Sequence, residues 1–313
     1  MSDANRAAIS VVGSLNIDYF TKVQTLPTPG ETVSSRRLEL FRGGKGANQA
    51  ISACRQGAKV YFFGCVGEDE DGVAYRKALT DEGIDVSHLN RVSTKTGAAF
   101  ITVDDSGENM IVIAPGANDR LDIDDIKAGR DVIAGSRAVL GQFETPLEAL
   151  VEAATIANKE NIPVVINPSP IKPEFPWHLI QTDYLIVNEG EAVEVLGFAP
   201  LSEGEATLRQ RLHELRVEYL IVTRGSDDTL LFSRTGMSET IETLPVLPVD
   251  TVGAGDSFAG CFTARIAAGE KMEDAIRAAN CAGALTTLGA GAQDPIPDYE
   301  KVDQHLDHLS SKS

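Results

Sequence analysis

Cysteine is scarce in this sequence. There are four cysteines among 313 residues, and no two of them have Cys-x-x-Cys spacing. No apolar run approaches the roughly 18 residues that a membrane-spanning helix needs. The stretch MSDANRAAIS has neither the basic nor the apolar part of a signal peptide. We therefore expect a protein of the reducing cytoplasm, without a disulfide framework and without a membrane partner.

Basic residues are also in deficit. The chain has 28 lysines and arginines against 46 aspartates and glutamates, so its formal net charge at pH 7 is −18. This balance argues against nucleic acid or an anionic membrane as the main partner, because both repel an acidic surface. An anionic ligand must then be held by local donors.

The sequence is rich in short apolar runs that alternate with helical patterns, which predicts a parallel β-sheet covered by helices. The apolarity of these runs is nearly continuous, as in strands that are buried on both faces. The predicted strands are residues 9–13, 60–66, 138–143, 164–167, 184–188 and 219–225. The predicted helices lie between 145 and 161 and over 203–217, 256–269 and 271–288. A capping box of Thr145 to Glu148 is expected before the first of them.

Residues 16–41 and 96–113 interrupt this rhythm. In the first stretch, polar and apolar residues alternate around a Pro-Gly turn, and the second has two strand-like runs joined by DSGEN. We expect them to form a small antiparallel sheet that stands off the main body. Its apolar face needs a ligand, a lid position or another subunit to cover it. Because there is no internal repeat or linker, we treat 1–313 as one domain with these segments inserted as a lid.

The stretch VDTVGAGDSFAGCF, residues 249–262, combines a glycine turn with a carboxylate. The glycines leave backbone N–H groups free, and the helix that follows adds positive potential, so an anion fits there. Asp256 beside this anion site is well placed as a general base; alternatively, it only caps the helix. The glycine spacing does not match the dinucleotide fingerprint, which argues against a nicotinamide-dependent oxidoreductase.

A second glycine-rich stretch, RGGKGANQA at 42–50, differs from a Walker phosphate loop, because Gly46 follows Lys45 where that loop has Ser or Thr. Gly43, Gly44 and Gly46 are expected to leave the backbone unhindered at a helix N-terminus.

Polar side chains near these glycines suit a neutral ligand. Lys45 and Asn48 are expected in the first helical turn, where a polyol fits their donors; an exposed helix start is the alternative. Upstream, Asn16 and Asp18 are two residues apart in an extended segment and so point to the same face. Such a pair grips vicinal hydroxyls, although Asn-x-Asp is also ordinary turn chemistry.

Seven motifs occur in the order and approximate spacing of the ribokinase-like (phosphofructokinase-B type) sugar kinases: GSLNID, PTPGET, GGKGANQA, VGEDEDG, NEGEA, TRGSDDTLLF and DTVGAGDSFAG. The chain resembles this family over nearly its whole length. The resemblance implies a three-layer α/β/α fold with a mostly parallel central sheet and a small β-sheet lid. It implies transfer of the γ-phosphoryl group of ATP to a sugar, with the 5-hydroxyl of D-ribose as the expected acceptor. It also implies Mg²⁺ as cofactor, activation by K⁺, and a homodimer formed through the lids.

The same resemblance assigns roles to individual positions. Asp256 is the implied base, and Gly253, Ala254 and Gly255 form the implied anion hole with it. The implied sugar contacts are Asn16, Asp18, Gly44, Lys45, Asn48 and Glu144. The positions implied near the nucleotide and magnesium are Asn188, Glu191, Thr223, Gly225 and Asn280. The implied potassium site comprises Asp250, Val252, Thr286, Gly289 and Gly291. This chain departs from the family there, with Pro295 in place of the common Ser and Gly289 in place of a longer side chain.

Several acceptors stay open within this family. Asn16 favours ribose over 2-deoxyribose, because an amide can bond a 2-hydroxyl and is left unpaired by the analogue that lacks it. Fructose, 2-keto-3-deoxygluconate and adenosine are the other candidates. A non-catalytic sugar-binding protein is a further alternative, against which the intact GAGD sequence argues.

Overall fold

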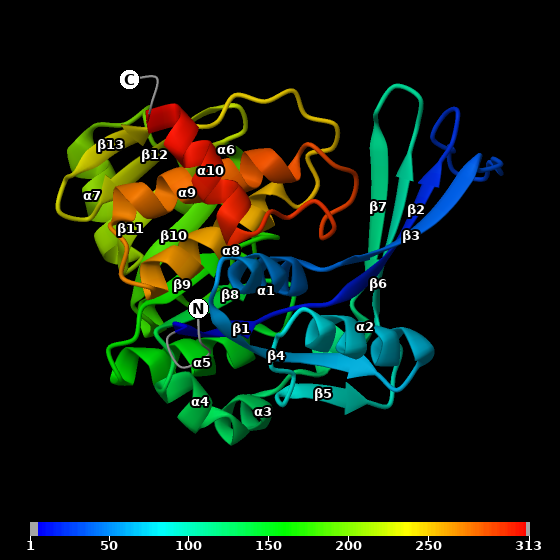
Figure 1. Cartoon of the computed structure of the whole chain (residues 1–313), viewed down its shortest axis with the longest axis horizontal. Coiled ribbons are helices and arrows are strands. Elements are labelled where there is room, and N and C mark those ends of the chain that lie inside the picture. Colours follow the sequence, from blue (N-terminus) through cyan, green and yellow to red (C-terminus); the bar gives the residue numbers. More distant parts are fainter. Residues whose placement is uncertain (1–5, 311–313) are drawn as a thin grey trace.

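The computed structural model describes residues 6–310, in which a nine-stranded sheet forms the centre of the molecule (Figure 1). In spatial order its strands are β13 (Ser238–Ile241), β12 (Asp227–Ser233), β11 (Val217–Arg224), β10 (Thr182–Asn188), β9 (Val164–Asn167), β8 (Ala138–Gln142), β1 (Ala8–Val12), β4 (Lys59–Gly67) and β5 (Leu89–Val92). All six predicted strands are confirmed, with ends within two residues of those expected. The strands from β11 to β5 are parallel, and β12 and β13 add an antiparallel edge.

Helices cover both faces of this sheet. One face carries α1 (Lys45–Arg55), α2 (Glu70–Asp81), α8 (Ala254–Ala267) and α9 (Met272–Thr286), with α10 (Tyr299–Ser310) packed outside α9. The other face carries α3 (Ile123–Ala128), α4 (Arg130–Ala134), α5 (Leu147–Lys159), α6 (Glu189–Leu196) and α7 (Glu205–Glu214). Each face has its own cluster of buried apolar side chains, so the fold is the expected three-layer α/β/α arrangement.

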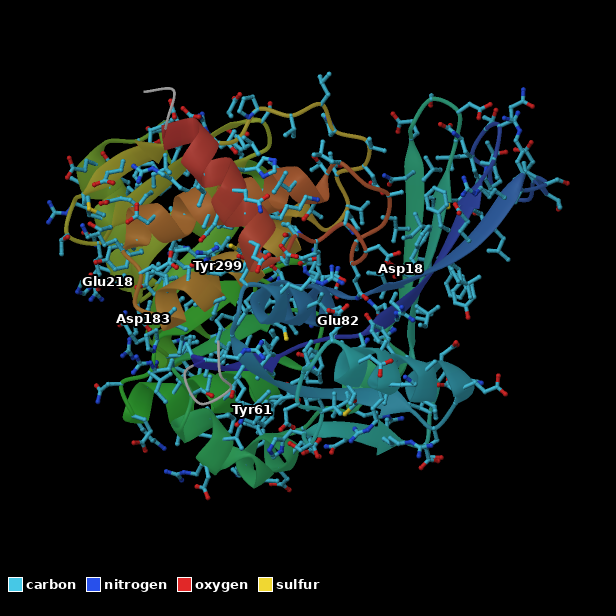
Figure 2. All side chains as sticks on the ribbon, viewed as in Figure 1. Asp18, Tyr61, Glu82, Asp183, Glu218 and Tyr299 are labelled. Atoms are coloured by element: carbon cyan, nitrogen blue, oxygen red, sulfur yellow. The ribbon has the colours of Figure 1, made fainter. Side chains whose placement is uncertain are left out.

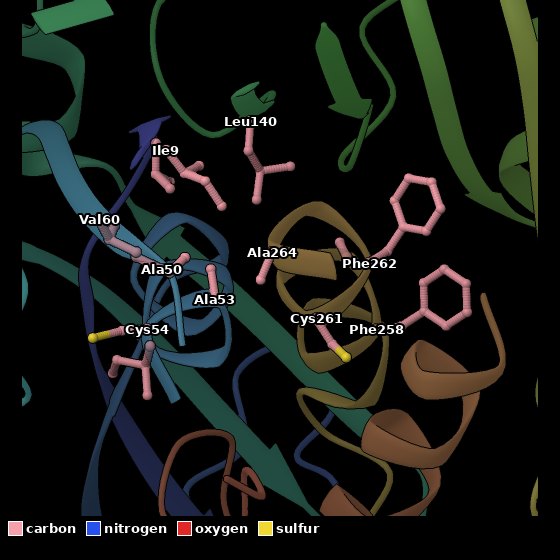
Figure 3. Close-up of a cluster of buried hydrophobic side chains, with 14 of the residues drawn as sticks. Ile9, Ala50, Ala53, Cys54, Val60, Leu140, Phe258, Cys261, Phe262 and Ala264 are labelled. Atoms are coloured by element: carbon pink, nitrogen blue, oxygen red, sulfur yellow. The ribbon is translucent and has the colours of Figure 1, made fainter. Parts of the chain in front are cut away.

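Helices α1 and α8 pack closely because small residues face each other (Figure 3). Ala50 and Ala53 of α1 lie opposite Cys261 and Ala264 of α8 in the buried cluster. At Gly260 a Cβ atom would lie 2.3 Å from the carbonyl oxygen of Gln49, so only glycine permits this approach. The contact matters for the site, because each helix contributes functional side chains near its N-terminus.

The predicted capping box before α5 is wrong. The helix does begin at Leu147, but the N-cap is Pro146, which has no side chain that can accept a hydrogen bond. The Thr145 hydroxyl is buried and has no hydrogen-bond partner within the described part of the chain. The fixed φ of proline starts the helix instead.

A separate four-stranded sheet, here called the small sheet, stands beside the body (Figure 1). Its spatial order is β3 (Arg37–Gly43), β2 (Asn16–Lys22), β6 (Gly97–Val103) and β7 (Asn109–Ala114). The small sheet was expected to be antiparallel, but its central pair, β2 and β6, is parallel. The reason is that β2 and β6 both leave the body in the same direction, directly after strands of the large sheet.

Within residues 6–310, no helix combines the length and apolarity that crossing a bilayer requires. The first five residues of the MSDANRAAIS stretch, and the last three of the expected domain 1–313, lie outside the described residues.

Candidate active site

The predicted site residues gather at the carboxyl ends of the parallel strands. Strands β1, β8, β9, β10 and β11 all end at this edge, and α1, α6 and α8 begin there. Ligands of open α/β sheets bind at this edge because loops and helix N-termini converge on it. The order of the strands therefore brings together motifs that are more than 200 residues apart in the sequence.

Asp256 lies in the first turn of α8, as predicted from the glycine turn before it. Gly253 is the N-cap with φ +79°, and a Cβ atom there would lie 2.7 Å from the Ala292 carbonyl oxygen. A Cβ on Gly255 would meet no atom within 4 Å, so the backbone there is open. The Ala254 amide donates weakly to the Thr251 carbonyl at 3.4 Å. The amides of Gly255 and Asp256 are thus the better-placed donors for an incoming anion at this helix start.

Asp256 is only 8% exposed, and its carboxylate accepts a hydrogen bond on each oxygen. Asn48 Nδ2 donates to Oδ2 at 2.9 Å, and Gln49 Nε2 donates to Oδ1 at 2.9 Å. The Asn48 Oδ1 atom in turn accepts from Gln293 Nε2 at 2.9 Å. Asn48 therefore binds the residue that the family resemblance implies as the base. Its predicted contact with the sugar stays a prediction. Gln49 and Gln293 were missed from the sequence.

The glycines of the RGGKGANQA stretch face this chain's own backbone. Helix α1 begins at Lys45, as expected, after the N-cap Gly44 with φ +88°. A Cβ on Gly44 would lie 2.7 Å from the Asn16 amide nitrogen, and one on Gly46 would lie 2.4 Å from that of Ser14. A Cβ on Gly43 would strike the Asp18 carboxylate. The expectation of unhindered backbone was wrong, because the β1–β2 connection packs directly against it.

Asn16 and Asp18 both lie on β2 where it leaves the body. Asn16 is buried, and its Oδ1 atom accepts from Asn118 Nδ2 at 2.9 Å. Asn118 is itself fixed by the backbone N–H and carbonyl of Leu15. The amide nitrogen of Asn16 is thereby left as its donor to a ligand. Asn118 was missed because it is distant in sequence and belongs to no motif.

Asp18 lies on β2, near the point where the small sheet leaves the body (Figure 2). Burial, and then the negative charges of Glu144 and Asp256, raise the pKa of Asp18 to about 7. Three carboxylates thus share one region of the site. Such crowding is costly without a ligand and is typical of functional sites.

Glu144 and Lys45 meet beside this region. Glu144 Oε2 accepts from the Ser14 hydroxyl at 2.5 Å and from the Lys45 backbone amide at 3.1 Å. Burial alone would lower the pKa of the Lys45 ammonium, but the charges of Asp256, Glu144 and Glu191 raise it above its ordinary value. Lys45 is therefore held as a cation by the carboxylates of Asp256, Glu144 and Glu191.

Two adjoining cavities lie beside the start of α8. A polar cavity of about 220 Å³ is lined by Lys45, Asn188, Glu191, Gly253, Gly255 and Asp256, among others, and Lys45 is the one cation in its lining. A larger, more apolar cavity of about 450 Å³ includes Val246, Pro248, Phe258 and Ala284. Thr223, Thr251 and Gly255 line both cavities. A polar compartment that continues into an apolar one fits a phosphate chain attached to a base.

The predicted nucleotide residues serve the protein's own structure as well. Asn188 and Glu191 form a reciprocal capping box at the start of α6, at 2.8 and 2.9 Å, which leaves the second carboxylate oxygen of Glu191 for a ligand. Asn280 lines the apolar cavity, yet its amide bonds Thr229 and the carbonyl of Glu242. Thr223 and Gly225 line that cavity at the end of β11.

The predicted potassium residues come from the loop before α8, from the end of α9 and from the loop that follows α9. Asp250 joins the two loops, since its carboxylate accepts from the amides of Val252 and Gly291, each at 3.0 Å. Thr286 ends α9, and its carbonyl accepts weakly from the Gly289 amide at 3.4 Å.

The two departures from the family pattern touch each other near the residues that were predicted to bind potassium. A Cβ atom on Gly289 would lie 2.7 Å from Cβ of Pro295. Glycine at 289 therefore accommodates proline at 295, and the two differences form one packing unit.

Comparison with known proteins places the chain among carbohydrate kinases. The pfkB family carbohydrate kinase model matches residues 6–299. The chain is 37% identical to the ribokinase of Haemophilus influenzae over 305 residues, which cover 97% of this chain and 99% of that protein. It is 30% identical to the deoxyribokinase of Salmonella typhi, with 95% and 98% covered.

A solved structure shares the fold as well. It is the Arabidopsis thaliana ribokinase complexed with ribose and ATP, which superposes with a TM-score of 0.87 at 29% identity, covering 96% of this chain and 99% of that one. The family match over residues 6–299 and these similarities show that the chain belongs to the pfkB family of carbohydrate kinases.

Proposed function

We propose that this chain transfers the γ-phosphoryl group of ATP to the 5-hydroxyl of D-ribose, with Asp256 as the general base. The observation that carries the proposal is the position of the Asp256 carboxylate. It lies at the start of α8, near the carboxylates of Asp18 and Glu144, and it lines the polar one of the two adjoining cavities that fit a nucleotide.

In the proposed reaction Asp256 accepts the proton of the sugar hydroxyl as its oxygen attacks the γ-phosphorus. The new oxygen–phosphorus bond forms while the bond to the ADP oxygen breaks, and ADP leaves with that electron pair. The transition state spreads negative charge over the phosphoryl oxygens, so catalysis depends on positioning and charge neutralisation. The amides of Gly255 and Asp256 and the Lys45 ammonium supply positive potential on the side where this charge develops.

The polar cavity suits magnesium, because the second carboxylate oxygen of Glu191 would be available to hold the ion directly or through one of its water ligands. When bound with ATP, the ion neutralises the β- and γ-phosphate charge. The adenosine part fits the larger cavity, whose lining is mostly apolar.

Ribose is proposed over 2-deoxyribose because of the fixed amide of Asn16. Asn118 holds its oxygen, so its nitrogen is the atom that can donate to a sugar, and a bound analogue without the 2-hydroxyl would cover this nitrogen and leave it unpaired. An unpaired buried donor costs about 1–3 kcal/mol, or roughly 5- to 150-fold in discrimination. The free, buried cysteines at 54, 65, 261 and 281 suit the proposed cytoplasmic location.

An ADP-release assay over ribose, 2-deoxyribose, fructose, 2-keto-3-deoxygluconate and adenosine tests the function. We expect the highest kcat/KM with ribose, and a preference over 2-deoxyribose that shrinks in Asn16→Ala. Equal use of ribose and 2-deoxyribose would contradict the assignment of Asn16, and release of ADP with none of these acceptors above background would contradict the proposed substrate.

Potassium is proposed to bind carbonyl groups of the two loops joined by Asp250. The residues fit such an ion, because the two differences from the family, at Gly289 and Pro295, alter side chains only. The backbone carbonyls of these loops are still present as ligands. An ion there would fix the loop that contains Gly253, next to the anion hole. We expect turnover to fall when potassium is replaced by tetramethylammonium at equal ionic strength; unchanged turnover would exclude the activating site.

A homodimer is proposed to form through the small sheet. By strand register, Leu40, Tyr19, Phe100 and Val112 form one row across its four strands. Leu40, Phe100 and Val112 are 56%, 48% and 58% exposed, which is unusual for neighbouring large apolar residues. Packing of two such faces would cover them and would support the small sheet as a lid over the sugar.

Sedimentation of the Val112→Asp variant tests this interface. We expect the wild-type chain to be a dimer and the variant a monomer, because a buried unpaired charge opposes association. The control is Val73→Asp, which places the same charge at a 52% exposed valine on α2, outside the small sheet. A monomeric wild type, or a dimer that survives the change at 112, would contradict the proposal.

A further inference from the structure

The hydrogen bonds around Asp256 extend to buried amides that have no role in the reaction proposed above. Gln49, on α1, donates from Nε2 to Asp256 Oδ1 at 2.9 Å and to Asn167 Oδ1 at 3.0 Å. Its Oε1 atom accepts from Gln142 Nε2, at the end of β8, at 2.6 Å. The Gln49 side chain is fully buried.

These partners fix which end of the Gln49 amide faces the carboxylate. Asn167 must present its oxygen, because its own Nδ2 atom donates to the Ile186 carbonyl at 3.0 Å. If the Gln49 amide were turned around, its oxygen would face two acceptors, and its nitrogen would face the Gln142 donor. The network therefore has one favourable arrangement, in which a donor is aimed at Asp256.

Asn48 completes the arrangement from the other side. Its Nδ2 atom bonds the second oxygen of Asp256, and its Oδ1 atom is held by Gln293. Each carboxylate oxygen thus has one fixed amide donor, so the plane of the carboxylate is defined before any ligand binds. A base must keep such an orientation within small tolerances, since a misplacement of about 1 Å can cost roughly 100-fold in rate.

We propose that Gln49 is a positioning residue for the reaction: oriented by Gln142 and Asn167, it fixes the rotation of the Asp256 carboxylate toward the acceptor hydroxyl. The proposal rests on the role of Asp256 as the base. The competing view is that these amides only join α1 to α8 and to the sheet. That view predicts a loss of stability with no specific effect on the chemical step.

The first test replaces Gln49 by methionine, which keeps the length of the side chain and removes its donors. With ribose and ATP we expect kcat to fall by about 10- to 100-fold, while both KM values stay within about twofold. The matched control is Gln56→Met, a buried glutamine at the other end of α1 whose amide bonds the Pro297 carbonyl and Arg265. The control should lower the melting temperature and leave kcat unchanged.

The decisive readout is a double-mutant cycle with Asp256→Asn. If Gln49 acts through Asp256, Gln49→Met should cause little further loss of kcat in the Asp256→Asn enzyme. An equal fold loss in both backgrounds, or a normal kcat for Gln49→Met, would overturn the positioning role. A normal kcat for Asp256→Asn alone would instead refute the proposed base, so the two failures are distinguishable.

A second variant keeps the test valid if Gln49→Met does not fold. This variant is Gln142→Met, which can affect Asp256 only by removing the hydrogen bond from Gln142 to Gln49. The change costs no other side-chain hydrogen bond of Gln142, because its Oε1 atom has no partner among the described residues. We expect a smaller fall in kcat that also disappears in the Asp256→Asn background. An unchanged kcat in this variant, with the fold intact, would contradict the chain of orientation.

Discussion

Replacement of Asp256 by asparagine is expected to lower kcat by ~10²–10⁴, the range for loss of a general base. Asparagine has nearly the same shape but accepts no proton at neutral pH. The new side-chain NH₂ group would face the NH₂ group of Asn48 or Gln49, where the wild type has an acceptor. A small loss of stability is therefore also expected. Sugar binding should change little, because the proposed contacts of Asn16, Asp18 and Glu144 with the sugar remain. Single-turnover rates and equilibrium sugar binding measure the two effects separately.

An aspartate in the same helical position elsewhere provides the control. Asp274 lies in the first turn of the neighbouring helix α9, where it is exposed and pairs with Arg277. Asp274→Asn should leave kcat unchanged. If Asp256→Asn retained near-normal turnover, the proposed base would be wrong, whatever the behaviour of the control.

The second large effect is expected at Asp18, whose pKa is raised to about 7 by burial and by Glu144 and Asp256. The ionised carboxylate accepts hydrogen bonds from two hydroxyls, whereas the protonated group offers fewer acceptors. We therefore expect kcat/KM for ribose to decrease as the pH falls below about 7, up to tenfold per pH unit. Asp18→Asn should remove this dependence and raise the sugar KM by about 10- to 100-fold, as for loss of a hydrogen bond to a charged group.

Ionisation of Asp18 should have the opposite effect on the stability of the fold: it favours sugar binding but destabilises the folded chain. The pKa of Asp18 in the folded chain lies above the ordinary value of 3.8, so the folded state binds more protons than the unfolded state between these values. The free energy of unfolding should therefore fall as the pH rises through this window. Asp18→Asn removes the penalty and should be more stable than the wild type by about 1–3 kcal/mol near pH 8, and by less near pH 5.

Urea denaturation of the two proteins without ligands at both pH values measures this difference. Asp105→Asn is the control, because Asp105 is exposed in the turn of the small sheet and pairs with Arg36. A wild type that is more stable than Asp18→Asn near pH 8 would contradict the raised pKa and the charge crowding behind it.

The large sheet could be predicted because its parallel strands are buried on both faces. Such strands appear as uninterrupted apolar runs, for example Val164–Asn167, which was predicted with its observed bounds. The antiparallel edge strand Ser238–Ile241 was missed, since four residues with an exposed face give no comparable signal. The parallel centre of the small sheet was also missed, because strand direction depends on where β2 and β6 leave the body.

The site was predictable where glycine spacing and a charged residue occur in one short stretch. The GAGD turn indicated Asp256 at a helix start, and the structure confirms this placement. The amides that hold its carboxylate could not be inferred, because Gln49 and Gln293 reach it only after α1, α8 and a late loop are packed together. The glycines at 43, 44 and 46 had a detectable pattern, but a close approach of this chain to itself leaves the same pattern as an approach to a ligand.

The most direct measurement is a crystal structure of the protein with ribose and a non-hydrolysable ATP analogue. We expect a carboxylate oxygen of Asp256 within about 2.6–3.2 Å of the sugar 5-hydroxyl oxygen, with the γ-phosphate next to the amides of Gly255 and Asp256. A bound sugar whose hydroxyls all lie beyond hydrogen-bond reach of Asp256 while the γ-phosphate is in place would contradict this expectation.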